Sequence, residues 1–222
     1  MEKAVNSVIH AGEMSIARFV VNTLRENTYI YYNNVREGIL VDCGVRRAEE
    51  QAEVAEFILA QGITIKHHLL THAHFDHVWG AQWAFDNYGV KPTLLSEEFR
   101  NYPLAEMIMQ RKLHRTDLRL PLPENPTLVS DGHTVSISHA SLRFIYAPGH
   151  SIGGACLYDS NNKILFCGDC LFKGYIGLPK DPGLSPDLMP ATLREKIYTL
   201  PHDTLTLPGH GPEFMLQDAV GL

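Results

Sequence analysis

The chain has few cysteines, no long apolar run and no cluster of charge of one sign. Four cysteines in 222 residues are too few for a disulfide framework. No segment reaches the ~18 consecutive apolar residues of a membrane helix. Residues 1–18 lack the uninterrupted apolar core of a secretion signal. These absences argue against a disulfide-stabilised secreted domain and an integral membrane protein, so we expect a cytoplasmic protein with no membrane partner.

Basic residues are outnumbered by acidic residues, 19 against 25, which gives a net charge of −6. They are scattered apart from short pairs such as Arg46-Arg47 and Arg111-Lys112, so the chain has no basic stripe of the kind that binds nucleic acid. Apolar residues at 45% and charged residues at 20% are typical of an ordinary folded domain. We therefore expect a globular protein that acts on a small-molecule substrate and binds no nucleic acid.

Strand-like and helix-like segments follow one another in two comparable halves. The first half predicts an antiparallel meander over residues 16–42, a helix over 48–61 ended by Gly62, a strand over 66–70 and a helix over 77–88. The second half predicts a helix over 104–113, strands over 134–138, 142–147, 155–158 and 163–167, a helix over 187–199 and a strand over 204–207. Two such halves packed sheet to sheet would form an α/β fold, a four-layer αββα sandwich. We expect residues 1–13 to be a loose leader and residues 14–222 to be a single domain.

Histidine and aspartate are concentrated in four short segments. The densest segment reads Thr71-His72-Ala73-His74-Phe75-Asp76-His77, and the other three end in His150, Asp169 and His210. Each of these three follows an apolar, strand-like run. The repeated order of strand, turn and ligand indicates a metal site built on loops at one edge of a sheet.

The spacing inside the first segment suits more than one ion. His72, His74 and Asp76 are spaced by two, which places them on one side of an extended chain. His77 breaks this alternation and can reach a neighbouring position, while Asp76 stands where the N-cap of the next helix would be. One segment could thus serve two ions about 3.5–4 Å apart. Imidazole and carboxylate ligands favour two divalent transition-metal ions, Zn²⁺ first, with iron or manganese as alternatives.

Other residues of the same types have simpler interpretations. Cys167 and Cys170 form a CxxC, but this motif indicates a redox pair only near a matching βαβ unit, and here it closes a strand. His67 or His68, just before the cluster, could support a ligand through a hydrogen bond. The remaining histidines are left unassigned: His10, His114, His133, His139 and His202.

The combined set of residues carries a resemblance to a known family. His72-x-His74-x-Asp76-His77 with His150, Asp169 and His210 resembles the metallo-β-lactamase superfamily over residues 14–212. Within that span, residues 148–153 and 166–172 look most like the short bacterial relatives of glyoxalase II, the hydroxyacylglutathione hydrolases. The resemblance implies the αββα sandwich with the site at one edge. It also implies that His72, His74 and His150 bind the first metal, that Asp76, His77 and His210 bind the second, and that Asp169 bridges both.

The chain departs from these relatives where the substrate would bind. Val78-Trp79-Gly80 replaces the usual small residues, and residues 174–179 lack the Gly-Arg pair of many close relatives. The printed sequence ends twelve residues after His210, without the helical extension that helps full-length glyoxalase II hold glutathione. Glutathione recognition is thus left open. We expect Lys173, Tyr175 and Trp79 to contribute to substrate binding, Lys173 or Tyr175 by contacting an anionic group.

The charge of the predicted site favours hydrolysis. Two divalent ions, the carboxylates of Asp76 and Asp169, and a bridging hydroxide leave a residual charge near +1, which would stabilise a developing oxyanion. We therefore predict a dinuclear-metal hydrolase in which a metal-bound hydroxide attacks the carbonyl of a small thioester or ester. Asp76 is placed to accept or shuttle a proton, and Asp169 to hold both ions.

Several alternatives stay open from the sequence. One is a lactonase of the same superfamily. Another is a mononuclear iron persulfide dioxygenase that would use His72, His150 and Asp169, and a third is a scaffold that metal merely stabilises. The apolar residues of 104–113 could roof a pocket or pack a homodimer, although burial in the core is the simpler interpretation.

Overall fold

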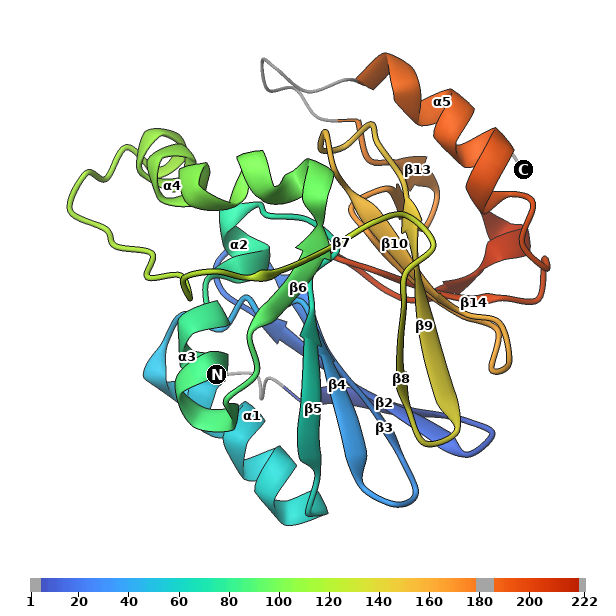
Figure 1. Cartoon of the computed structure of the whole chain (residues 1–222), viewed down its shortest axis with the longest axis horizontal. Coiled ribbons are helices and arrows are strands. Elements are labelled where there is room, and N and C mark those ends of the chain that lie inside the picture. The colour runs from blue at the N-terminus through green and yellow to red at the C-terminus, as the bar shows by residue number, and fades with distance from the viewer. Residues whose placement is uncertain (1–4, 179–185, 220–222) are drawn as a thin grey trace.

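The computed structural model describes residues 5–178 and 186–219. Two β-sheets lie face to face, with helices on the outer face of each (Figure 1). The predicted four-layer αββα sandwich is therefore confirmed. Within the described residues, no helix is long and apolar enough to cross a membrane.

The first sheet is half antiparallel and half parallel. Its seven strands lie in chain order: β1 (Val5–Ala11), β2 (Met14–Val21), β3 (Glu26–Asn33), β4 (Glu37–Val41), β5 (Thr64–Leu69), β6 (Pro92–Leu95) and β7 (Thr127–Val129). Strands β1 to β4 form the predicted antiparallel meander, and β4 to β7 run parallel. The carboxyl ends of β4, β5 and β6 therefore lie at one edge of the sheet.

The second sheet places three further strands toward the same edge. Its order is β15-β14-β11-β10-β9-β8, with β8 (Thr134–Ile137), β9 (Ala140–Tyr146), β10 (Ala155–Asp159), β11 (Ile164–Gly168), β14 (Leu205–Pro208) and β15 (Phe214–Met215). Strands β11 and β14 are parallel, while β10 is antiparallel to both β9 and β11. Strands β9, β11 and β14 thus end together. A separate hairpin, β12 (Leu171–Phe172) and β13 (Tyr175–Ile176), follows β11.

The main core fills the space between the sheets. Phe166 of β11 is fully buried, and its ring makes edge contacts with Tyr29 and Tyr31 of β3 at centroid distances of 5.4 and 5.6 Å. Phe144 and Leu207 of the second sheet belong to the same cluster. Because one face of each sheet is apolar, packing the two faces together removes both from water.

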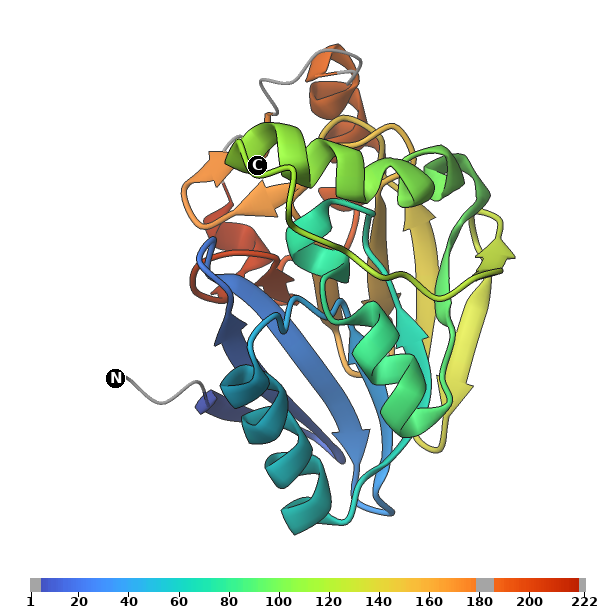
Figure 2. The ribbon, with the colours of Figure 1, turned by 90° about the vertical axis from the view of Figure 1, so that its left-hand side faces the viewer.

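Helices cover the outer faces. On the first sheet lie α1 (Ala48–Gln61) and α3 (Ala81–Tyr88), which are side by side in Figure 2. On the second sheet, η3 (Pro186–Leu188), α5 (Met189–Thr192) and a π-helical segment, η4 (Leu193–Ile197), form one continuous run. At the edge lie α2 (Phe75–Val78), η1 (Ser96–Arg100), η2 (Tyr102–Leu104) and α4 (Ala105–Leu113), and η5 (Leu216–Asp218) follows β15. Gly62 ends α1 at φ 65°, as predicted.

The expectation of a loose leader is wrong for residues 5–11. These residues form β1, which pairs with β2 in antiparallel register from Ser7–Arg18 to Ala11–Met14. Ile9 and Ala11 pack against the core between the sheets. Pairing of the backbone with β2 therefore overrides the mixed polar and apolar composition that made this segment look unstructured.

The predicted helix over residues 77–88 is two helices. It divides at Trp79-Gly80, where a side chain on Gly80 would overlap Val45 and Cys43, so the chain turns against the loop that follows β4. The N-cap position of α2 belongs to His74, and Asp76 lies inside the first turn. The prediction that Asp76 caps a helix is therefore wrong, which leaves its carboxylate free for other partners.

His68 lies in the core in a way that the sequence did not predict. The neighbouring residue, Leu69, faces the core between the sheets. His68 therefore points to the opposite face of the sheet, where it pairs with Leu40 on the side that the helices cover. Burial lowers the pKa of His68 to about 3, and neither ring nitrogen has a hydrogen-bond partner among the described residues. His68 is thus a neutral core residue that supports no ligand.

Replacing His68 by leucine is expected to raise the free energy of unfolding by about 1–3 kcal/mol, because two unsatisfied buried polar atoms disappear. Chemical denaturation followed by circular dichroism measures the change. His67→Leu is the matched control, since His67 is partly exposed on the same strand. A lower denaturation midpoint for His68→Leu would contradict the expectation.

Candidate metal centre

The predicted ligands all lie at the common edge of the two sheets, Asp76 and His77 in the short helix α2 and the others in loops. His72, His74, Asp76 and His77 follow β5 and run into α2. His150 follows β9, Asp169 follows β11 and His210 follows β14. The folding of two separate sheets thus brings together residues that are far apart in sequence.

One group of three imidazoles faces a common point. His74 Nδ1 lies 3.0 Å from His72 Nε2 and 3.0 Å from His150 Nε2. Three Zn–N bonds of 2.0–2.1 Å in tetrahedral geometry would separate the nitrogens by roughly 3.3 Å. His72, His74 and His150 are therefore close to the arrangement that one metal ion requires.

A second group contains one carboxylate and two imidazoles. Asp76 Oδ2 lies 3.2 Å from His210 Nε2 and 3.9 Å from His77 Nε2. These three ligand atoms lie within 4.8 Å of one another, as those of the first group do. The structure thus contains two neighbouring groups, each with three potential ligands.

Asp169 lies between the two groups. Its Oδ2 is 3.4 Å from His150 Nε2 and 3.5 Å from His210 Nε2, and its Oδ1 is 3.5 Å from His77 Nε2. A side chain on Gly209 would overlap Asp169 Oδ1 and the His77 ring, so the glycine leaves room for this approach. One carboxylate is therefore adjacent to members of both groups.

The hydrogen bonds of the imidazoles fit metal binding. His77 Nδ1 bonds Asp42, and His210 Nδ1 bonds the carbonyls of Leu24 and Arg25. His150 Nδ1 faces the Gly177 carbonyl at 3.3 Å, and His72 Nδ1 faces Thr71 Oγ1 at 3.1 Å. These oxygens can accept a hydrogen bond from Nδ1–H, and in that neutral tautomer each Nε2 carries the lone pair.

Two atoms of the cluster are buried without a hydrogen-bond partner among the described residues: His77 Nε2 and Asp169 Oδ1. The two atoms face each other at 3.5 Å, and a ring nitrogen and a carboxylate oxygen buried without hydrogen bonds would be costly in a purely structural role. A cation would satisfy both, so the residues present fit a metal group.

The two groups differ in their affinity for protons. Burial and the neighbouring imidazoles lower the pKa of His72, and burial lowers the pKa of His74 to about 3. Burial also lowers the pKa of His150. In the other group burial acts the same way, but the carboxylates outweigh it: Asp169 and Asp42 raise the pKa of His77, and Asp76 and Asp169 raise that of His210.

Asp42 is a functional residue that the sequence prediction missed. Its Oδ2 lies 2.9 Å from His77 Nδ1 and accepts a 2.7 Å hydrogen bond from Thr71 Oγ1, while its Oδ1 accepts the Thr71 amide. Asp42 therefore orients His77 directly and His72 through Thr71. Asp42 directly follows β4, as Asp169 directly follows β11, so the pattern of a strand followed by an acidic residue could have found it.

The carboxyl groups counted for the charge of the predicted site were incomplete. Asp42 and Glu26 are both buried beside His77, and neither was counted among the carboxylates from sequence. Burial raises the pKa of Glu26 well above its ordinary value. The predicted residual charge near +1 therefore leaves out two buried acidic side chains next to the ligand cluster.

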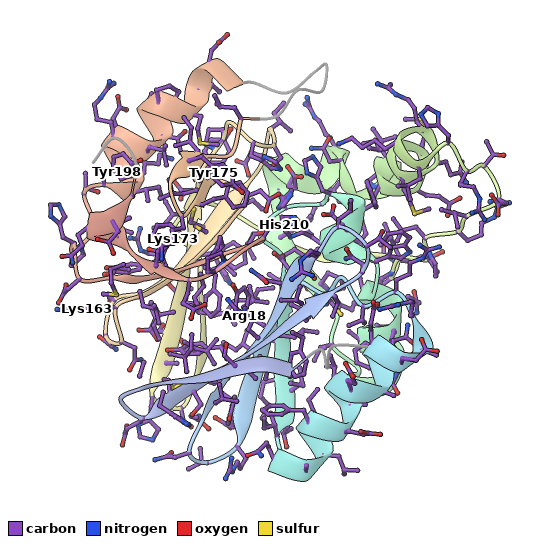
Figure 3. The ribbon with its side chains drawn as sticks, turned by 180° about the vertical axis from the view of Figure 1, so that it is seen from behind. Arg18, Lys163, Lys173, Tyr175, Tyr198 and His210 are labelled. Carbon is purple, nitrogen blue, oxygen red and sulfur yellow. The ribbon has the colours of Figure 1, made fainter. Side chains whose placement is uncertain are left out.

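The three residues predicted to bind substrate have different surroundings. Trp79 is almost fully buried, with its ring against Phe75 and the Arg46 guanidinium over it at 4.5 Å. Tyr175 is 57% exposed and stacks on Phe172, whose ring centroid is 6.4 Å from that of His210. Lys173 is exposed on the same hairpin, and Figure 3 shows it with Tyr175 and His210. The hairpin, more than the indole, is positioned beside the ligand cluster.

Comparison with known proteins agrees with this geometry. The family model described as metallo-beta-lactamase superfamily matches residues 21–210. The probable metallo-hydrolase YqgX of Bacillus subtilis is 28% identical over 200 residues, which cover 90% of this chain and 92% of that protein. Hydroxyacylglutathione hydrolase GloC of Haemophilus influenzae is 25% identical over 200 residues, which cover 89% and 91%.

Among solved structures, TTHA1623 in a di-iron-bound form matches with a TM-score of 0.77 and 27% identity, covering 90% of this chain and 94% of that chain. The family match spans most of the chain, and the fold, the loop positions and the His/Asp groups agree with it. The chain belongs to the metallo-beta-lactamase superfamily.

Proposed function

We propose that this protein is a dinuclear-metal hydrolase that cleaves a small thioester or ester, as glyoxalase II-like enzymes do. Superfamily membership and similarity to a protein named metallo-hydrolase support a metal-dependent hydrolase. The observation that carries the finer proposal is Asp169, which lies between two complete groups of three ligands. Similarity to a hydroxyacylglutathione hydrolase supports the thioester class.

In this proposal, His72, His74 and His150 would hold one ion, Asp76, His77 and His210 would hold the other, and Asp169 is placed to serve both. Zn²⁺ is the preferred metal for these nitrogen and oxygen ligands, with iron or manganese as alternatives. Bound there, divalent ions would polarise a carbonyl and lower the pKa of water toward 7. Asp76, whose Oδ2 lies 3.2 Å from His210 Nε2, is placed to accept a proton at the reacting centre.

The hairpin of β12 and β13 is proposed to bind the part of the substrate that does not react. Tyr175 offers an exposed ring and hydroxyl, and Lys173 offers a cation for an anionic group. Trp79 would act only indirectly in this proposal, because its ring packs against Phe75.

Metal analysis and a substrate panel test the proposal. We expect two metal ions per chain and hydrolysis of S-lactoylglutathione or another small thioester with kcat/KM of about 10⁴ M⁻¹s⁻¹ or more. Lactones and β-lactams complete the panel. One iron per chain together with oxygen consumption on a persulfide would favour the dioxygenase alternative. Two bound ions without hydrolysis of any thioester, ester or lactone would reject the proposal.

Lys173→Ala is expected to raise KM for anionic thioesters about tenfold with kcat nearly unchanged, because it removes a contact made before the reaction begins. Steady-state kinetics measures both constants. Lys163→Ala is the matched control, since Lys163 precedes the opposite end of β11 and pairs with Asp203. Equal KM values for Lys173→Ala and the unsubstituted protein on every anionic substrate would remove Lys173 from the binding site.

A further inference from the structure

Two buried glutamates, Glu26 and Glu98, have no part in the ligand set. Both are fully buried, and among the described residues no lysine or arginine pairs with either of them. Burying a carboxylate without a cationic partner is costly unless hydrogen bonds or a nearby cation compensate. Each therefore needs a physical reason for its position.

Glu98 joins the two loops that carry the first group of imidazoles. Its Oε1 accepts the amide of Ala73, between His72 and His74, at 2.9 Å. Its Oε2 accepts the amide of Gly153, three residues after His150, at 2.8 Å. A side chain at Gly153 would overlap the backbone of Glu98, so glycine permits this close packing.

Glu26 occupies the corresponding position behind the second group. Its Oε2 accepts hydrogen bonds from Thr28 Oγ1 at 2.7 Å and from the Gly44 amide at 3.1 Å. Its Oε1 has no hydrogen-bond partner and lies 4.0 Å from His77 Nδ1.

The backbone extends this link to the other members of the second group. Glu26 forms a β-bridge with His210, and the next amide, that of Asn27, donates to the Gly209 carbonyl at 2.7 Å. A side chain at Gly44 would overlap both the Glu26 carboxylate and the carbonyl of Asp76. Glu26 thus contacts the segments that carry Asp76, His77 and His210, whereas Glu98 contacts the segments that carry His72, His74 and His150.

We infer that Glu98 and Glu26 are positioning residues, each of which sets the geometry of one metal position independently of the other. The inference rests on the two-metal site of the proposed function. Glu98 holds the spacing of two loops whose imidazoles must converge within about 3 Å. Glu26 holds the segments of His77 and His210 in place through its hydrogen bonds with Thr28 and Gly44 and its β-bridge with His210.

The test is metal affinity, not catalysis. Zn²⁺ is titrated into the metal-free full-length protein against a chromophoric chelator. Glu26→Gln and Glu98→Gln, which keep the shape but replace one acceptor oxygen with NH₂, are each expected to weaken the binding of one of the two ions about 10–100-fold and to leave the affinity for the other unchanged. Glu97→Gln is the matched control, since Glu97 is adjacent to Glu98 but exposed, and it should bind both ions normally.

His210→Ala then separates the positions, because it removes one ligand of the second group. In the His210→Ala protein, Glu98→Gln should still weaken the binding of the remaining ion about 10–100-fold, whereas Glu26→Gln should leave the affinity for that ion unchanged. Equal effects of both glutamine variants on the remaining ion, or wild-type affinity for both ions in the single variants, would overturn the inference. A protein that binds two ions but hydrolyses nothing would reject the proposed function and leave this result standing.

Thr28→Val and Asn101→Ala cover the case in which a glutamine variant does not fold. Thr28 donates to Glu26, and Asn101 Nδ2 donates to Glu98 Oε1 at 3.2 Å. Each variant removes one hydrogen bond to a buried glutamate and leaves the glutamate itself in place. We expect each variant to lose less metal affinity than the corresponding glutamine variant, and to lose it at the same metal position. A loss of affinity at both positions would count against the inference.

Discussion

Replacing Asp169 by asparagine is expected to lower kcat/KM at least about 1000-fold, which is about 4 kcal/mol of transition-state stabilisation. Asp169 Oδ2 lies within 3.5 Å of ligand nitrogens of both groups, and Oδ1 lies 3.5 Å from His77 Nε2. An amide replaces one oxygen with NH₂, which cannot coordinate a cation. It also removes the negative charge that would hold two divalent ions at close range.

Metal content should change together with the rate. Mass spectrometry of the native protein is expected to show loss of at least one ion from Asp169→Asn, while circular dichroism shows an unchanged fold. Asp203→Asn is the matched control, because Asp203 is an exposed aspartate that pairs with Lys163. Activity within tenfold of the unsubstituted protein, with both ions retained, would show that Asp169 does not bridge the site.

The sequence predicted the long strands and the convergence of the ligand loops because both depend on local pattern. The meander of β2, β3 and β4 consists of short runs rich in β-branched and aromatic residues separated by turns, and each ligand segment follows a strand. The short buried strand β6 (Pro92–Leu95) was not predicted, since a four-residue apolar run with no alternation does not distinguish a strand from other buried structure. Strand β1 was not predicted because its stability comes from pairing with β2.

The residues that hold the ligands in place were harder to predict than the ligands themselves. Glu98 bonds Ala73 and Gly153, which are 25 and 55 residues away in sequence. Glu26 is 51 positions before His77 in the sequence. Because a glutamate at the start of a strand is usually exposed to solvent, nothing in the sequence indicated that Glu26 lies beside His77. Only the packing of the two sheets distinguishes these carboxylates from solvated ones. For Trp79 the sequence suggested a role that the structure does not favour. Its position next to the cluster in sequence suggested contact with substrate, whereas its ring packs against Phe75.

Lowering the pH is expected to remove the two ions in sequence, the ion of the Asp76, His77 and His210 group first. Protons compete with metal for imidazole nitrogen, so a group with a raised pKa loses metal at a higher pH than a group with a lowered pKa. Asp169 and Asp42 raise the pKa of His77 above its ordinary value of 6.5, whereas burial lowers the pKa of His74 to about 3. Metal analysis after gel filtration at a series of pH values should show two ions at pH 8, about one near pH 6, and hydrolysis lost with the first ion. Simultaneous loss of both ions would contradict the assignment of unequal proton affinity.

The same pKa shifts predict the opposite pH dependence for the metal-free protein. A histidine whose pKa is raised by folding stabilises the folded state fully below its ordinary value of 6.5, and this contribution is lost as the pH rises through the folded pKa. The histidines whose pKa is lowered by burial act in the opposite direction, but above about pH 7.5 they are neutral in both the folded and the unfolded state. The unfolding temperature of the metal-free protein should therefore fall between about pH 7.5 and pH 8.5. His77→Gln removes the titrating ring that carries most of this effect, so its metal-free form should show a flatter profile. A metal-free protein that grows more stable over this range would mean that His77 is neutral among its carboxylates, and the order of metal loss would then have to come from geometry alone.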